Sequence, residues 1–290
     1  ARLALHEGVP AEQILCGNGA ADLIFRLVWA KKPRRALVTA PTFAEYATAL
    51  KSVGCMVERF FLREQEDFAV TDAFCAAIRP GVDMVFLCQP NNPTGQLTAL
   101  PLVEQILHRC AACGTLLVVD ECFLDFLPDH ALHTAKGLLG EGDLVILKAF
   151  TKLYGMAGVR LGYALSADTA LLEQMQACGQ PWGVSSLAQA AGLAALEETA
   201  YVEKVRTLIA EQRPRLTAGL RALGLRVLDG RANYLLFQAP ETLGETLRQR
   251  GAVLRSCANY PGLGPGWYRT AVRTGPENEQ LLKLIAEVLE

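Results

Sequence analysis

Short apolar runs alternate with amphipathic segments through the first two thirds of the chain. Candidate buried strands are the runs RALVTAP, DMVFLCQP, GTLLVVDE and GDLVILKAF, at residues 35–41, 83–90, 114–121 and 142–150. The intervening segments, residues 42–54, 69–81 and 101–114, carry apolar residues at helical spacing and end near glycine. Strands that are apolar on both faces and alternate with helices are typical of a mostly parallel sheet sandwiched by helices. The pattern therefore predicts an α/β fold.

The pattern changes in the last third of the chain. Residues 185–224 form a long helical stretch, and Pro214 predicts that it is bent or broken near that point. Strand-like and helical segments then follow in the order βαββα, at residues 231–238, 241–251, 253–257, 267–274 and 277–290. This order is typical of a separate small α+β domain. We expect a large α/β domain over residues 1–190, and a linking helix with a small C-terminal α+β domain over residues 191–290.

Composition and charge narrow the classes of ligand. The chain has 290 residues, of which 51% are hydrophobic and 20% charged, as in a globular protein with a substantial core. The net charge of −2 gives no bulk attraction to nucleic acid or to an anionic membrane, so local arginines must hold any anionic ligand. We find no bilayer-spanning apolar run and no signal peptide. The chain opens at Ala1 inside a helical pattern, and we interpret it as a fragment.

The cysteines indicate free thiols. Their odd number, 9, and irregular spacing do not suggest a disulfide framework, so we expect a cytoplasmic protein. The motif CAAC at residues 110–113 stands near the end of a helical pattern without a second such pair to complete a zinc site. We interpret Cys110 and Cys113 as buried or half-buried thiols and expect no metal.

Polar residues follow several of the predicted strands. Asn91 and Asn92 come after the second strand, Asp120 and Glu121 end the third, and Lys148 near the end of the fourth leads to Lys152. Ligands of such sheets bind beyond the carboxyl ends of the strands, where these side chains would meet. Each residue also has a structural explanation. Asn92 could belong to an ordinary Asn-Pro turn, and Asp120 could pair with an arginine in the core.

A glycine-rich turn supplies a candidate anion site. Gly17 and Gly19 flank Asn18 at the start of a predicted helix, where free amides and the helix dipole suit a phosphate. Such a turn is also a common structural cap. Together, an amine, a carboxylate, an amide and cationic phosphate donors match the needs of pyridoxal 5'-phosphate (PLP).

Three motifs in this order, NNPTG, VVDE and TKLYGMAGVRLGY, resemble fold-type-I PLP-dependent enzymes of the aminotransferase class I/II family, with the aspartate aminotransferase-like fold. The resemblance implies that Lys152 bonds covalently to the cofactor aldehyde, that Asp120 pairs with the pyridine nitrogen and that Asn92 donates to the ring hydroxyl. It also assigns Arg160, Gly19 and Ala20 to the cofactor phosphate, and Phe43 to the stack on the pyridine ring. Lys148 does not match the lysine position of the motif.

Two positions depart from the family pattern. Ala149 stands where the family commonly has a phosphate-binding serine, a loss of about 1 kcal/mol that Thr151 or an amide could offset. Phe123 stands where a tyrosine often contacts the ring hydroxyl. Neither change removes the covalent link or the partner of the pyridine nitrogen.

The C-terminal motifs GRANYLLF and RSCANYPGL resemble one group within the family, the L-threonine-O-3-phosphate decarboxylases of cobalamin biosynthesis. By this resemblance Arg255 binds the substrate phosphate and Arg269, with Asn92, the carboxylate. Guanidinium groups bind either anion in bidentate fashion. Arg273 has the spacing to assist Arg269 on the same strand face. Exposed arginines of an edge strand are the structural alternative.

The resemblance implies PLP-dependent decarboxylation of L-threonine O-3-phosphate to (R)-1-amino-2-propanol O-2-phosphate by a homodimer. The family's N-terminal arm, which closes over the substrate, is missing from the sequence. A histidinol-phosphate or related class I/II aminotransferase is the first alternative, because the same residues serve both reactions. A non-catalytic PLP-fold binding protein is another. A nucleotide-binding protein is disfavoured, since no GxGxxG or P-loop motif follows a strand.

Overall fold

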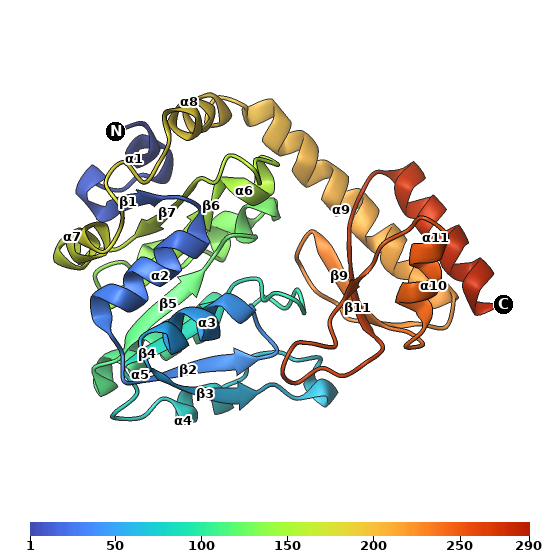
Figure 1. Cartoon of the computed structure of the whole chain (residues 1–290), viewed down its shortest axis with the longest axis horizontal. Helices are drawn as coiled ribbons and strands as arrows, with labels where there is room; N and C mark the ends of the chain where they lie inside the picture. Colours follow the sequence, from blue (N-terminus) through green and yellow to red (C-terminus); the bar gives the residue numbers. More distant parts are fainter.

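A mostly parallel sheet forms the larger part of the molecule (Figure 1). The computed structural model describes residues 1–290. The 7 strands of this sheet lie in the order β1-β7-β6-β5-β4-β2-β3. Their bounds are β1 (Ile14–Gly17), β2 (Arg35–Ala40), β3 (Met56–Phe61), β4 (Met84–Cys88), β5 (Leu116–Asp120), β6 (Leu144–Ala149) and β7 (Gly162–Leu165). Strands β2 to β6 pair in parallel, and β7 runs antiparallel to both β6 and β1.

Helices cover both faces of this sheet, as the apolar runs predicted. One face packs against α2 (Ala20–Lys31), α3 (Ala44–Ser52) and α7 (Thr169–Ala177), and the other against α4 (Ala73–Ala77), α5 (Leu100–Cys113) and α8 (Ser186–Ala195). Adjacent residues of β2 pack in different apolar cores, because Val38 faces the first set of helices and Leu37 faces the second. Two short helices, α1 (Arg2–Glu7) and α6 (Phe150–Leu153), complete this part.

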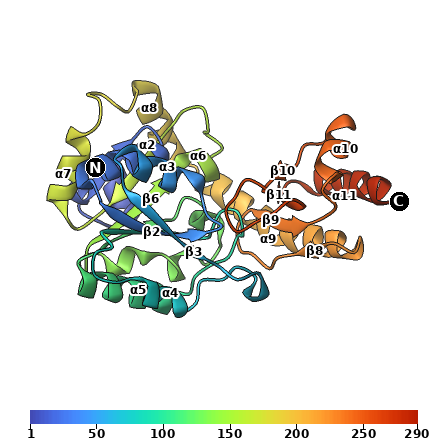
Figure 2. The same cartoon turned by 60° about the horizontal axis from the view of Figure 1, so that its bottom comes forward.

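A second, antiparallel sheet lies at the other end of the molecule (Figure 2). It has the order β10-β11-β9-β8, with β8 (Arg226–Val227), β9 (Tyr234–Gln238), β10 (Arg255–Ser256) and β11 (Trp267–Ala271). It shares an apolar core with α9 (Thr199–Ala222), α10 (Leu243–Gln249) and α11 (Gly275–Leu289). The predicted βαββα order is therefore present, with β8 added in front of it.

The helix is not broken near Pro214, one of the two outcomes that this proline predicted. Pro214 lies inside α9, and the helical stretch breaks instead at residues 196–198, between α8 and α9. Proline removes only one N–H from the helix, and the buried side chains of Ile209 and Leu216 hold the helix on both sides of it. The sequence reading also passed over β1 and β3, which form the two edges of the large sheet.

We keep the division of the chain near residue 190 as a proposal. Residue 190 falls within α8, which still packs on the large sheet, and α9 then runs across to the second sheet (Figure 1). None of the helices combines the length and apolarity needed to cross a membrane.

Candidate active site

A pocket opens where β4, β5 and β6 end. Its wall consists of Ala20, Ala21, Phe43, Cys88, Asn92, Asp120, Cys122, Phe123, Ala149, Thr151, Lys152 and Arg160. All the residues predicted to contact the cofactor are in this set except Gly19, which lies against Arg160. The structure thus gathers side chains that span more than a hundred positions of sequence at the carboxyl edge of a parallel sheet.

Backbone amides and a guanidinium form one end of the pocket. Gly19 caps α2 with φ 84°, and a Cβ on it would lie 2.7 Å from Nη2 of Arg160. A Cβ on Gly162 of β7 would lie 2.6 Å from the amide nitrogen of Ala20. The two glycines therefore let the start of α2, Arg160 and the sheet come together. Free amides at a helix start beside a cation form an anion site.

Asp120 is held at the other end. It is 5% exposed, and its carboxylate accepts hydrogen bonds from the Tyr46 hydroxyl (2.6 Å) and the Cys122 amide (3.0 Å). Burial, and then the charge of Asp120, raise the pKa of Tyr46 well above its usual value, so the phenol remains a donor. The sequence reading missed Tyr46. Its position three residues after Phe43, on the same helical face, was the available signal.

The amine of Lys152 is free, whereas that of Lys148 is not. Lys152 is exposed and takes part in no ion pair; its Nζ lies 5.3 Å from the centre of the Phe123 ring. Lys148 is 5% exposed, and its Nζ contacts Asp125 at 2.9 Å and Glu7 at 3.4 Å. Lys148 therefore lies outside the pocket, although its position at a strand end suggested that it could meet the other polar groups there.

The surroundings of Lys148 form a second, larger cavity of about 320 Å³. Glu7 lines it and accepts hydrogen bonds from the Tyr163 hydroxyl and from Lys136. Burial opposes ionisation of Glu7, but Lys148, Tyr163 and Lys136 together lower its pKa to about 2. Because these charges neutralise one another, the cavity offers no free amine for the chemistry.

The two asparagines of NNPTG have different surroundings. The side chain of Asn91 accepts from Thr42 (2.8 Å) and donates to the Pro41 carbonyl and to Thr94 (both 2.9 Å). Its bonds are thus used within the loop. Asn92 instead lines the pocket, where its Oδ1 accepts a hydrogen bond from Arg269. Asn91 positions the loop that presents Asn92.

The two predicted substrate arginines are direct partners across β10 and β11. Arg255 pairs with Arg269 in the register, and Arg269 lies over the Tyr234 ring with its guanidinium 5.0 Å from the ring centre. Arg255 is exposed and donates to Asn259 (3.2 Å). Arg273 does not join them: it follows β11 and forms an ion pair with Glu277 (2.6 Å).

Two thiols that the sequence reading did not assign to the pocket lie beside Asp120. Burial raises the pKa of Cys88 to about 12 and that of Cys122 well above its usual value, so both remain protonated. All the cysteines are free; in CAAC, Cys110 is buried and Cys113 half-buried, as predicted.

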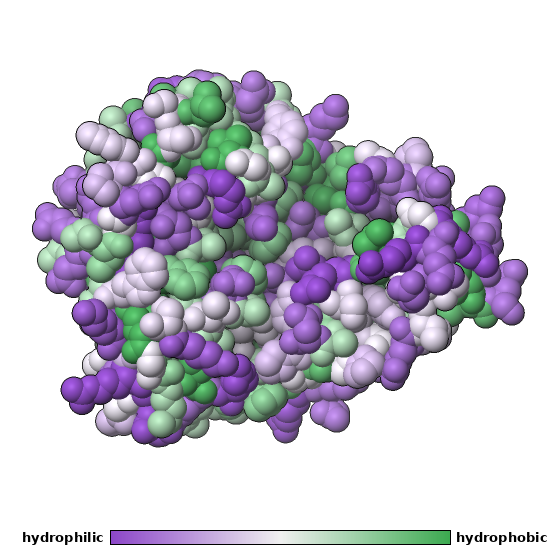
Figure 3. Space-filling view, in the orientation of Figure 1, coloured by the Kyte–Doolittle hydropathy of each residue, from purple (hydrophilic) through white to green (hydrophobic).

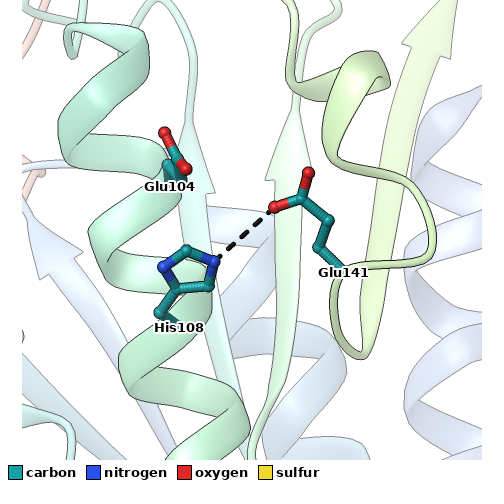
Figure 4. A group of neighbouring side chains, drawn as sticks. All are labelled: Glu104, His108 and Glu141. Atoms are coloured by element: carbon teal, nitrogen blue, oxygen red, sulfur yellow. Dashed lines mark ion pairs between the residues drawn. The ribbon is translucent and has the colours of Figure 1, made fainter.

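One group of possible metal ligands lies outside the pocket (Figure 4). Glu104 and His108 of α5 approach Glu141, with ligand atoms within 4.8 Å of one another, and His108 lies 3.6 Å from the Glu141 carboxylate. All three side chains are exposed. We interpret the group as a surface ion pair, with no part in the pocket.

Comparisons with known proteins agree with this geometry. The chain is 40% identical to the threonine-phosphate decarboxylase of Salmonella typhimurium over 291 residues, 99% of this chain and 80% of that protein. It is 32% identical to a histidinol-phosphate aminotransferase of Nitratidesulfovibrio vulgaris, covering 99% of this chain and 78% of the relative. The histidinol-phosphate aminotransferase structure from Clostridium acetobutylicum superposes with a TM-score of 0.92 at 25% identity, over 99% of this chain and 87% of that one. The family model for aminotransferase class I and II matches residues 3–288, and the chain belongs to this family.

Proposed function

We propose that the pocket binds pyridoxal 5'-phosphate. The residues present fit this cofactor: the amides at the start of α2 and Arg160 form an anion site for its phosphate, and the buried carboxylate of Asp120 provides a partner for its protonated ring nitrogen. The free amine of Lys152 provides the covalent attachment. When bound, the cofactor supplies the sink for the electrons of the broken substrate bond.

The remaining residues of the pocket orient the cofactor. Phe43 packs on the ring, and Asn92 donates to the ring hydroxyl; Phe123 closes the side beside Lys152 with an apolar ring. Thr151 takes the place of the phosphate donor that Ala149 lacks. Tyr46 keeps Asp120 in place from the buried side.

We propose that the reaction is the decarboxylation of L-threonine O-3-phosphate to (R)-1-amino-2-propanol O-2-phosphate in cobalamin biosynthesis. The pairing of Arg255 with Arg269, which donates to the pocket residue Asn92, carries this proposal. A substrate with a phosphate and a carboxylate needs two guanidinium groups a few ångströms apart. The similarity to the Salmonella decarboxylase supports the same choice.

Different side chains of the protein bind the substrate and transfer the proton. Arg269 and Asn92 hold the substrate carboxylate at the pocket, and Arg255 holds the phosphate. With the cofactor and substrate bound, Nζ of Lys152 would donate a proton to Cα of the substrate, the carbon that loses CO₂. Phe123 and the buried thiols keep water away from the reacting atoms.

Incubation of the cofactor-loaded protein with L-threonine O-3-phosphate tests the proposal. We expect CO₂ release without an added keto acid, and no release by Lys152→Ala. Lys204→Ala, a change at an exposed lysine of α9 without an ion pair, is the control and should keep full activity. Borohydride reduction followed by peptide mass spectrometry should locate the pyridoxyl group on Lys152. Turnover that requires 2-oxoglutarate would contradict decarboxylation.

Histidinol-phosphate amino transfer is the second candidate. Two similarities favour it: the TM-score of 0.92 to the histidinol-phosphate aminotransferase of Clostridium acetobutylicum, and the 32% identity to that of Nitratidesulfovibrio vulgaris. Its substrate has a phosphate but no carboxylate, so it leaves Arg269 free for the keto-acid partner. Amino transfer from histidinol phosphate to 2-oxoglutarate, without CO₂ release, would establish it.

We further propose that the protein is a cytoplasmic homodimer. Its cysteines are all free, as is usual in reducing compartments. Apolar side chains project from and around α8, among them Trp182 (78% exposed) and Leu187 (81%). Large exposed apolar patches mark interaction surfaces.

A further inference from the structure

A third cavity, of about 230 Å³, lies at the junction of the two sheets. It is lined by β2, β3, α3 and the loop between β10 and β11, which reaches the ends of β2 and β3 in Figure 1. The contact is close, since a Cβ on Gly262 of that loop would lie 3.1 Å from the Ala40 carbonyl oxygen. Phe43 separates this cavity from the cofactor pocket, because it lines both.

The charged side chains that line the cavity are both cationic. Arg59 of β3 and Lys51 near the end of α3 face it, and no acidic residue does. No ion pair or side-chain hydrogen bond of the structure involves either cation. Asn259 adds its amide: Oδ1 accepts from Arg255, which leaves Nδ2 as a donor.

Arg59 lacks a partner because of strand alternation. Glu58, its neighbour on β3, faces the opposite side of the sheet and pairs there with Arg35 (3.4 Å) and Arg79 (2.8 Å). The pleat places Arg59 beside Val38, on the side covered by α3. Arg59 is half-buried there, and no acidic side chain of the structure neutralises its guanidinium. An anion bound from solution would supply the counter-charge.

We propose that this cavity binds a phosphate group. Two unpaired cations and an amide donor match the double charge and the several oxygens of phosphate. The bound group connects α3 and β3 to Asn259, the residue that contacts Arg255. The site is distinct from the cofactor pocket and does not depend on which reaction that pocket performs.

Calorimetric titration of the cofactor-loaded protein with inorganic phosphate, at constant ionic strength, tests the site. We expect Lys51→Gln/Arg59→Gln to weaken phosphate binding by about tenfold or more, because both charge-assisted contacts are lost. Lys31→Gln/Lys204→Gln removes the same charge at two exposed positions outside the cavity and should bind like the wild type. Arg255→Gln should also retain binding, which separates this cavity from the site proposed for the substrate phosphate.

A second variant keeps the test independent of folding defects. Ala47→Glu places a carboxylate in the cavity wall, four residues before Lys51, where it supplies the missing counter-charge. We expect it to abolish phosphate binding while the melting temperature is kept or raised. Equal affinity of Lys51→Gln/Arg59→Gln and wild type, or no saturable binding by the wild type, would overturn the proposal.

Two sources of phosphate are distinguished by a parallel titration with O-phosphoethanolamine, a phosphate monoester. Tighter binding of this ester than of inorganic phosphate, lost in Lys51→Gln/Arg59→Gln, assigns the site to a phosphorylated metabolite. Tighter binding of inorganic phosphate, lost in the same variant, assigns it to the free ion.

Discussion

At the scale of single residues, two lysines four positions apart have opposite surroundings. Lys148 belongs to the pleat of β6 and points to the face where Glu7 and Asp125 neutralise it. Ala149, the next residue, faces the pocket instead, and the turn into α6 brings Lys152 to the same pocket. A one-residue step along β6 thus separates the neutralised amine of Lys148 from the turn that carries Lys152, the amine that we propose binds the cofactor.

Tyr46→Phe should weaken cofactor binding without unfolding the protein. The change removes the 2.6 Å hydrogen bond to Asp120 and leaves that carboxylate with the Cys122 amide. A hydrogen bond to a charged group contributes about 1.5–3 kcal/mol, so the dissociation constant of the cofactor should rise by about tenfold or more. Absorbance titration with pyridoxal 5'-phosphate measures it.

Tyr163→Phe is the matched control. Its hydroxyl is also buried and also donates to a carboxylate, that of Glu7, but on the other face of the sheet. We expect a similar loss of thermal stability and unchanged cofactor affinity. Equal cofactor affinity of Tyr46→Phe and wild type would show that Tyr46 packs in the core but does not position Asp120 for the cofactor.

What the sequence could reveal about the site depended on the distance between partners along the chain. Lys152 and Arg160 stand in one motif, and Asp120 and Asn92 each end an apolar run, so local patterns were sufficient to place them at one sheet edge. The bond between Tyr46 and Asp120 joins residues 74 positions apart, and no local pattern encodes it. The lack of an ion-pair partner for Arg59 likewise depends on the face of β3 from which this side chain projects, and the sequence does not show that face.

At the scale of elements, α1 is held to the large sheet by one buried carboxylate. Glu7, at the end of this short helix, contacts Lys148 of β6 and Tyr163 of β7. A helix of 6 residues is not stable alone, so these contacts fix its place.

Glu7→Gln should destabilise the fold by about 3 kcal/mol at neutral pH. The pKa of Glu7 is lowered from 4.5 to about 2, so its stabilisation is complete above about pH 4.5 and is lost as the pH falls towards 2. The difference in unfolding free energy between wild type and Glu7→Gln should therefore shrink over that range, in urea titrations at several pH values.

Glu121→Gln should change the pH dependence of the unfolding free energy in the opposite direction. Burial raises the pKa of Glu121 from 4.5 to about 7, so the folded state favours its neutral form. Wild type should lose stability relative to Glu121→Gln as the pH rises from about 4.5 to 7. Parallel pH curves for the two variants would contradict both assignments.

The elements themselves were predictable where one signal dominated. The central strands β4, β5 and β6 are apolar throughout, and α5 has a regular apolar face, so their patterns were unambiguous. Edge strand β3 mixes Glu58 and Arg59 with aromatic residues because each face has a different environment. Pro214 does not break α9, because the tertiary packing of this helix outweighs the loss of one helical hydrogen bond.

At the scale of the whole molecule, several strongly exposed apolar side chains lie around α8. Figure 3 shows them over the region of α8, and a groove between α1 and α8 continues the apolar surface. Leu187 and Leu193 of α8 are 81% and 53% exposed. A second copy of the chain is the occupant that we propose for this surface.

Light scattering after gel filtration should give a mass near twice the 31.4 kDa of one chain. Leu187→Glu/Leu193→Glu should shift the mass towards a single chain, because two charges would enter the apolar interface. Leu132→Glu/Val253→Glu, at positions 69% and 75% exposed elsewhere, should leave the mass unchanged. A single-chain mass for the wild type would refute the homodimer.

The close approach of Gly162 to the Ala20 amide links assembly of the sheet to vitamin B6 uptake. Even one methyl group at position 162 would push the start of α2 away from β7. Damage to the junction between β6 and β7 would then first appear as a colourless protein with normal helix content. Absorbance of the bound cofactor would therefore be a sensitive measure of correct pairing between β6 and β7.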